Sequence, residues 1–172
     1  DPWADPGVHI PGSLTQPALL LPFPAGKTWA YTGGPHTGWG SGAPFAAVDF
    51  APPGSAAGCG ISSEFSTAAA DGIVVRTGPG YLSLDLDGDG DDRTGWVLFY
   101  YHMADHERVK AGTVLEQDGQ IGHPSCEGTR ATGTHLHLAR KYNGEWLPLD
   151  GMAPFVMSGW TAHAGQRPYE GW

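Results

Sequence analysis

The chain lacks long apolar runs and clusters of basic residues. A helix that spans a membrane needs about 20 consecutive apolar residues, and no segment of the 172 residues provides them. Nine Lys and Arg residues are set against 18 Asp and Glu residues, so the formal net charge is −9. Nucleic acids and anionic membrane surfaces are bound through basic patches. We therefore expect no nucleic-acid partner and no membrane partner, and we interpret residues 1–172 as one soluble, monomeric domain.

Helical periodicity is also scarce. No long stretch combines Ala, Leu, Glu and Lys at helical spacing, whereas 27 Gly and 15 Pro residues interrupt the chain. The sequence therefore predicts an all-β fold of mainly antiparallel strands, in which the only candidate helix lies around residues 103–108. Strands and hairpins are expected within 27–34, 44–53, 71–87, 94–103, 108–122 and 133–149.

The two ends of the chain show no periodicity. Residues 1–25 contain several prolines, which predicts an extended arm laid over the sheet, and residues 150–172 are expected to form a loop-rich tail. The opening "DPWADPG" has none of the basic, apolar and small-residue regions of a signal peptide. This suggests a mature or excised form.

Cysteine is rare. Cys59 and Cys126 lie far apart and neither belongs to a CxxC, which excludes a thioredoxin-like redox motif and a zinc ribbon. One disulfide is the simplest interpretation, with two buried free thiols as the alternative. A bond that closes so long a loop would stabilise the fold by about 4 kcal/mol in the chain-entropy model.

The segment "TGTHLHLARK", residues 132–141, carries two imidazoles in a strand-like run. Because side chains alternate between the faces of a strand, His135 and His137 share one face while Leu136 and Leu138 share the other. Two histidines on one face of a rigid element can converge on a metal ion, and two ordinary surface histidines are the alternative.

Polar residues in apolar surroundings supply further candidate ligands. A catalytic zinc site takes three protein ligands and leaves a fourth position for water. His36 stands in the Gly-rich segment 33–44, which we expect to be a loop, and Asp49 lies within an apolar run where a lone carboxylate would be costly. His102 directly follows the apolar run "VLFYY". Three segments therefore each offer one polar side chain that could join the two-histidine strand.

Four motifs in a fixed order now point to a known family. The segments "GGPHTGWGSGAPFAAVDF", "YYHM" and "GTHLHL", with the Gly-turn segment "VKAGTVLEQDGQIG" between the last two, resemble the lysostaphin-type zinc endopeptidases. The resemblance covers roughly residues 20–150 and is greatest to the staphylolysin and beta-lytic branch. It implies that His36, Asp49 and His137 are the zinc ligands. It also implies that His102 and His135 are catalytic residues that do not bind the metal.

The resemblance also implies a fold and an activity. The expected fold is a lysostaphin-type β-sheet that forms the floor of a groove, with one Zn²⁺ ion on this floor. The expected reaction is hydrolysis of peptide bonds in a secreted setting, in the Gly-rich cross-bridges or stem peptides of peptidoglycan, by metal-activated water. A cysteine just before HxH, here Cys126, is a feature of the secreted branch and supports the disulfide.

Two other function classes remain open on the sequence alone. One is a non-enzymatic module that keeps the same fold to bind cell wall or to scaffold a partner, against which the presence of all five site residues speaks. The other is a calcium-dependent adhesive domain, which would need calcium and no zinc.

The segment "DLDGDGDD", residues 85–92, resembles the first half of a calcium-binding loop. Asp85, Asp87, Asp89 and Asp91 are the possible Ca²⁺ ligands. Trp96 stands where an EF-hand has its bidentate glutamate, which excludes an EF-hand. A solvated hairpin tip that keeps like charges apart is the alternative to a calcium site.

The remaining histidines and several aromatic residues have simpler interpretations. We expect His9, His106, His123 and His163 to be surface or loop residues. Four aromatic residues are candidate groove walls, with buried packing as the alternative for each: Tyr31, Trp39, Trp146 and Trp160.

Overall fold

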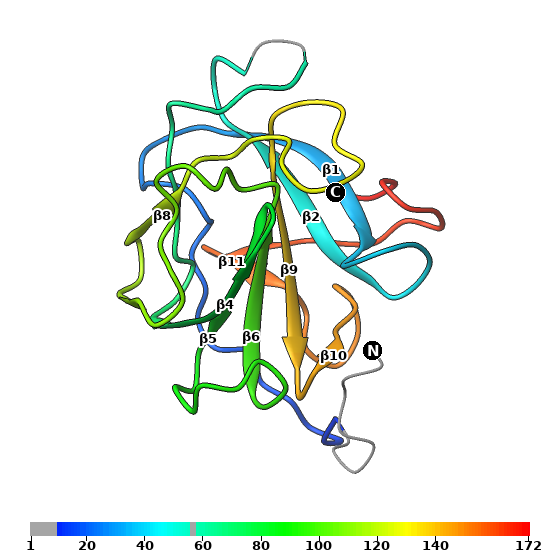
Figure 1. Ribbon diagram of the computed structural model, residues 1–172. Helices are drawn as coiled ribbons and strands as arrows, with labels where there is room; N and C mark the ends of the chain where they lie inside the picture. Colours follow the sequence, from blue (N-terminus) through cyan, green and yellow to red (C-terminus); the bar gives the residue numbers. More distant parts are fainter. Residues whose placement is uncertain (1–9, 56–57) are drawn as a thin grey trace.

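A computed structural model describes residues 10–55 and 58–172 and shows a strand-only architecture over these ranges (Figure 1). No helix occurs in the described residues, and accordingly none there is long and apolar enough to cross a membrane. The predicted all-β fold is confirmed. The prediction for His9, and the first nine residues of the predicted arm, lie outside the described part of the chain.

The main sheet is antiparallel throughout, and its strands occur in the order β1-β2-β9-β6-β5-β4-β7, with β10 paired to the C-terminal end of β9. Its strands are β1 (Ala30–Thr37), β2 (Phe45–Ala51), β4 (Gly72–Gly78), β5 (Tyr81–Asp85), β6 (Trp96–Tyr101), β7 (Val114–Leu115), β9 (Leu136–Tyr142) and β10 (Glu145–Trp146). Two small sheets flank it, one from β3 (Ser66–Thr67) and β8 (Gln120–Gly122), the other from β11 (Val156–Met157) and β12 (Trp160–Thr161).

The two faces of the central strand β9 have different surroundings. Leu136 and Leu138 are fully buried in the larger hydrophobic core, and burial of a leucine side chain stabilises a fold by about 1.5–3 kcal/mol. The opposite face carries His137 and Ala139, and Ala139 packs with Phe99 and Tyr101 in a smaller aromatic cluster. The alternation expected from "HLHL" is therefore present, and its polar face lies on the side of the smaller cluster.

The N-terminal arm contributes to the larger core. Leu19 and Phe23 are buried there, and Phe23 stacks on Trp29 with ring centroids 5.0 Å apart. The backbone amide of Leu20 donates a hydrogen bond to the Ala69 carbonyl at 2.8 Å. Residues 10–25 of the arm are thus held by apolar packing and single hydrogen bonds rather than by strand pairing.

Two local predictions are wrong. Residues 105–107 form a turn rather than a helix, with Glu107 at a positive φ of 57°. His36 lies on strand β1 and not in a loop, because the strand continues through Gly33, Gly34 and Pro35 with irregular register. β1 is an edge strand, and edge strands tolerate the bulges and the proline that a central strand excludes.

Cys59 and Cys126 form the predicted disulfide. The bond joins residues 67 positions apart, for which the chain-entropy model gives about 4 kcal/mol of stabilisation. It ties the segment after β2 to the loop that precedes β9. That loop leads directly to His135.

Candidate metal centre and groove

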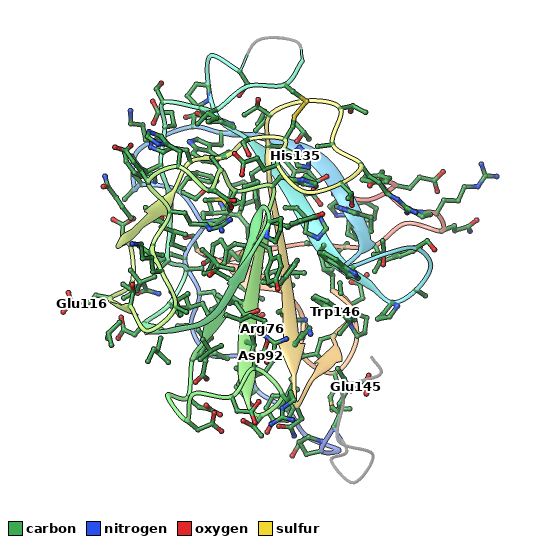
Figure 2. The ribbon with its side chains drawn as sticks, viewed as in Figure 1. Arg76, Asp92, Glu116, His135, Glu145 and Trp146 are labelled. Carbon is green, nitrogen blue, oxygen red and sulfur yellow. A yellow bond between two sulfur atoms is a disulfide. The ribbon has the colours of Figure 1, made fainter. Side chains whose placement is uncertain are left out.

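The register of four adjacent strands assembles a cluster of polar side chains. Asp49 on β2 lies opposite Gly33 on β1 and opposite His137 on β9, and His137 in turn lies opposite Tyr101, after which His102 follows. These side chains gather at the end of the strands where the loop before β9 reaches the sheet, beside the labelled His135 (Figure 2).

His36, Asp49 and His137 converge most closely. His36 Nε2 lies 3.0 Å from His137 Nδ1 and 3.3 Å from Asp49 Oδ1, and His137 Nδ1 lies 3.2 Å from Asp49 Oδ1. All three residues are buried, with 2%, 7% and 6% of their surface exposed. Three buried atoms of a metal-ligating type therefore form a triangle with sides near 3 Å.

The hydrogen bonds made by the second nitrogen of each imidazole ring determine what the three inner atoms can bind. His36 Nδ1 donates to the Gly34 carbonyl at 2.8 Å, and His137 Nε2 donates to the Gly38 carbonyl at 3.0 Å. In neutral imidazoles with these tautomers, His36 Nε2 and His137 Nδ1 each present a lone pair. Two lone pairs and a carboxylate oxygen then face one another, and only a cation can satisfy all three.

The charge and bonding of Asp49 fit the same interpretation. Its Oδ1 atom is buried and has no hydrogen-bond partner among residues 10–55 and 58–172. Burial disfavours the charged carboxylate, but ring protons and positive charge that His137 and His36 can direct at it outweigh burial and lower the pKa of Asp49 far below its usual value. When both rings are neutral with their lone pairs turned inward, a bound cation would take over this role. Asp49 is therefore an anion with an unsatisfied oxygen, and such a group is costly in a buried place unless a cation is present.

The spacing also fits zinc. With ligand distances of about 2.0–2.1 Å and tetrahedral geometry, two ligand atoms on one zinc ion lie roughly 3.3 Å apart. The three separations observed are 3.0, 3.2 and 3.3 Å. The backbone carbonyls that hold the outer ring nitrogens supply the orienting contacts that zinc-bound histidines usually have.

His102 and His135 lie beside this triangle as a second pair. Their ring centroids are 4.5 Å apart, and His135 Nε2 is 3.8 Å from Asp49 Oδ1, further than either ring nitrogen in the triangle. His102 Nδ1 donates to the Glu127 carbonyl at 3.0 Å and His135 Nδ1 donates to the Gly133 carbonyl at 2.7 Å. Each ring is therefore oriented by a backbone carbonyl, and its Nε2 atom remains available to accept or donate a proton.

His102 has an unusual backbone and an unusual pKa. Its φ of 60° is uncommon for a residue other than glycine, and strained conformations of this kind cluster at functional sites. Burial lowers the pKa of His102 to about 4, despite the opposing hydrogen bond to Glu127. The neutral ring, with Nδ1 donating to Glu127, presents a lone pair on Nε2.

Close contacts near the candidate metal ligands leave no room for a side chain at two glycine positions. A Cβ atom on Gly33 would lie 2.3 Å from Oδ2 of Asp49, so a side chain there would displace the carboxylate. A Cβ atom on Gly38 would lie 2.6 Å from the ring of Trp146, although the Gly38 carbonyl must stay in place to orient His137. The glycine content of "TGGPHTG" is thus explained by close contacts.

The polar cluster lies in a groove with a volume of about 910 Å³. Apart from the five site residues, its lining consists of Thr32, Thr37, Gly38, Trp39, Gly40, Ala51, Ser55, Gly58, Tyr101, Thr129, Arg130, Thr132, Gly133, Thr134 and Tyr169. Small residues and threonines make up most of this lining.

Of the four aromatic residues predicted as candidate groove walls, only Trp39 lines the groove. Trp39 lines the groove and is about half exposed. Trp146 packs on Phe99 and does not line the groove, and Tyr31 and Trp160 are exposed but do not line it either. Sequence reasoning missed Tyr169, whose ring stacks on His36 with centroids 4.3 Å apart. No motif marks this tyrosine, because only the path of the tail brings it to β1.

The acidic loop between β5 and β6 forms a separate group. Ligand atoms of Asp85, Asp87 and Asp89 lie within 4.8 Å of one another. Asp91 is not part of this group, because Arg93 binds its carboxylate at 2.6 and 2.8 Å. Calcium binding there stays a prediction.

The histidines outside the site also differ from one another. His106 and His163 are exposed, as predicted. His123 lies in the loop after β8, as predicted, but not at the surface, because its ring is buried, bonded to the Glu64 carbonyl and to Glu107, and packed on Phe65.

Comparisons with known proteins are consistent with this geometry. No family model matches the chain. The chain is 28% identical over 160 residues to a beta-lytic metalloendopeptidase of Achromobacter lyticus, covering 88% of the chain and 40% of that protein. It is 32% identical over 148 residues to protease LasA of Pseudomonas aeruginosa, covering 81% of the chain and 33% of that protein. The chain thus spans well under half the length of these two relatives.

A solved structure is also similar to the chain. The structure of pseudoalterin, described as an M23 metalloprotease from the deep sea, superimposes with a TM-score of 0.72 at 26% identity. The match covers 89% of the chain and 85% of pseudoalterin. The fold of the chain therefore has a relative among metalloproteases.

Proposed function

Because the chain belongs to the M23, or lysostaphin-type, metallopeptidase family, we propose that it is a secreted zinc endopeptidase that hydrolyses peptide bonds in bacterial cell wall. The observation that carries the proposal is the convergence of His36 Nε2, His137 Nδ1 and Asp49 Oδ1, with both imidazole rings held by backbone carbonyls. Two further imidazoles beside this triangle supply the groups that move protons.

His36, Asp49 and His137 would hold one zinc ion. Bound there, zinc would acidify a water molecule and polarise the carbonyl of the scissile bond. The protein's own part is to keep the three ligands deprotonated and oriented, which the carbonyls of Gly34 and Gly38 support.

His102 and His135 would act on protons and on developing charge. Both rings have Nδ1 occupied as a donor to a backbone carbonyl, so each Nε2 is free. One Nε2 can accept the proton of the attacking water, and the other, when protonated, can donate a hydrogen bond to the oxyanion. Their 4.5 Å ring separation lets both reach the same reacting centre.

The groove favours a peptide with small side chains near the scissile bond. Trp39 and Tyr169 line it beside the metal ligands, and the remaining lining is largely glycine and threonine. Peptidoglycan cross-bridges rich in glycine and the stem peptides are both substrates of this kind. The Cys59–Cys126 disulfide supports an oxidising, extracellular setting.

The alternative is a binding module that keeps the fold without catalysis. The unpartnered Oδ1 of Asp49 and the two anchored histidines favour the enzyme, since a binding module needs neither.

Metal analysis of the purified protein, followed by digestion of cell-wall fragments and mass spectrometry of the products, separates the two functions. We expect one zinc per chain and new peptide termini. Zinc-loaded protein that binds the fragments without cutting them would favour the module.

A further inference from the structure

The groove contains one feature that the proposed chemistry does not use. Arg130 is the only Lys or Arg side chain among the described residues that line it. It stands out in a chain with a formal net charge of −9 and only nine Lys and Arg residues. One of the few positively charged side chains of this protein therefore lies in the groove.

The guanidinium group of Arg130 is positioned but not neutralised. Nη1 donates to the Gly40 carbonyl at 3.2 Å, which links the loop before β9 to the loop between β1 and β2. No acidic side chain forms an ion pair with Arg130 within the described ranges 10–55 and 58–172. The nearest acidic neighbour in the sequence, Glu127, instead accepts a hydrogen bond from the backbone amide of Asp105 at 2.8 Å.

The loop that carries Arg130 is held on both sides. Before it, Cys126 is joined to Cys59, and the amide of Thr129 donates to the hydroxyl of Tyr101 at 2.7 Å. After it, the Thr134 hydroxyl donates to the Gly60 carbonyl at 2.8 Å. Arg130 itself has a positive φ of 66°, an uncommon conformation for a residue with a side chain. The fold therefore maintains a costly backbone conformation at the one arginine of the groove.

We propose that Arg130 forms an anion subsite in the groove and recognises a carboxylate of the substrate peptide. A guanidinium has five donors in a planar fork that matches a carboxylate, and the bond to Gly40 uses one of them. The carboxylate comes either from an acidic side chain near the scissile bond or from the C-terminus of the peptide. This proposal rests on the proposed peptidase function and narrows its substrates to peptides that carry a free carboxylate.

Two pairs of fluorogenic peptides containing Gly-Gly test the subsite. The first pair differs by Glu or Gln beside the Gly-Gly bond. The second pair contains only neutral residues and differs by a free or an amidated C-terminus. We expect the wild type to cut the carboxylate member of one pair with about tenfold higher kcat/KM, mainly through a lower KM. The preference should shrink at high salt, because the groove is open to solvent.

Arg130→Gln should bring the ratio of kcat/KM between the two peptides of that pair close to one. The pair that is affected identifies the source of the carboxylate. Lys110→Gln removes one positive charge from an exposed position outside the groove and should leave the ratio as in the wild type. Equal rates for both pairs in the wild type, or an unchanged preference in Arg130→Gln, would overturn the subsite.

Uncleavable ketomethylene analogues of the same peptides separate the two proposals. If no peptide is cut but the carboxylate analogue binds more tightly to the wild type than to Arg130→Gln, the peptidase function fails and the subsite stands. If the peptides are cut without any carboxylate preference, the subsite fails and the function stands.

Discussion

The metal centre and the acidic loop lie at opposite ends of the same strands and show two ways of gathering ligand atoms. His137 pairs with Tyr101 at one end of β6, whereas Asp85 pairs with Val97 near the other, roughly 13 Å away at the usual rise of a strand. Each end brings three ligand atoms together within 4.8 Å. Distance alone therefore does not distinguish them.

Hydrogen bonding does distinguish them. In the metal centre, backbone carbonyls occupy the outer ring nitrogens, so the inner atoms face one another without protons between them. In the acidic loop, backbone amides of the loop itself bind Asp85 and Asp89, and Thr94 donates to Asp89 as well. The first arrangement lacks only a cation, whereas in the second the carboxylates of Asp85 and Asp89 already accept hydrogen bonds from the loop.

The largest expected effect is loss of metal from the three inner ligands. His36→Ala, Asp49→Ala and His137→Ala should each be purified with little zinc and no detectable hydrolysis, because each removes one of three protein ligands. Zinc-to-protein ratios measured by mass spectrometry check this. Near-stoichiometric zinc in any of the three would remove that residue from the site.

The next largest effect separates the two histidines of one strand face. His135→Ala, like His102→Ala, should retain zinc and the fold but lose hydrolysis by about 10² to 10⁴-fold, because a proton-transfer or oxyanion group is removed. Circular dichroism and zinc content are the controls. If His135→Ala loses zinc as fully as His137→Ala, the strand donates both imidazoles to the metal.

A smaller effect is expected where a ligand is only displaced. Gly33→Ala places a methyl group on the carboxylate of Asp49 and should weaken zinc binding by about 10 to 100-fold, as orienting contacts typically do. Competition with a zinc chelator measures it. Gly12→Ala, where a Cβ atom would meet nothing within 4 Å, is the matched control and should bind zinc as the wild type does.

The smallest effect belongs to the acidic loop. Burial, followed by the hydrogen bond with Asp85, raises the pKa of Asp87 to about 6. The folded chain therefore holds this proton more tightly than an unfolded Asp of pKa about 3.9. The resulting stability is present below pH 4 and is lost as pH rises through 6. It is small, because Asp87 is largely exposed.

Melting temperatures at pH 5 and pH 7, with and without calcium, test this reading of the loop. If the loop is a solvated hairpin tip, stability should fall slightly with rising pH, Asp87→Ala should remove this fall, and calcium should cause no shift. A stabilisation by calcium that Asp87→Ala abolishes would instead establish a calcium site.

Much of the site could be predicted from the sequence because its signals are local. The spacing of His135 and His137 places both on one face of a strand, and Asp49 is conspicuous as a carboxylate in an apolar run. Strand positions and the hairpin at Asn143 and Gly144 follow from β-propensity and turn chemistry in the same way. None of this requires knowledge of which strands are neighbours.

The burial of Arg140 could not be predicted from local sequence signals. This residue is fully buried on β9, and its guanidinium donates to the carbonyls of Pro148, Ala153 and Pro154 and to the side chain of Gln16. An arginine without a carboxylate partner in its own segment would be expected at the surface. Its burial depends on carbonyls supplied by a later loop and by the N-terminal arm, and no pattern within "LARKY" reveals them.

By itself, the sequence determined the β class of the fold, the shared face of His135 and His137, and the disulfide partners, because periodicity, side-chain chemistry and a count of two cysteines are properties of the chain. Only the tertiary structure decided that His36 sits on a bulged edge strand, that Tyr169 stacks on it, and that Arg130 enters the groove. These outcomes depend on strand register and on the paths of loops, which are set by contacts between segments far apart in the chain.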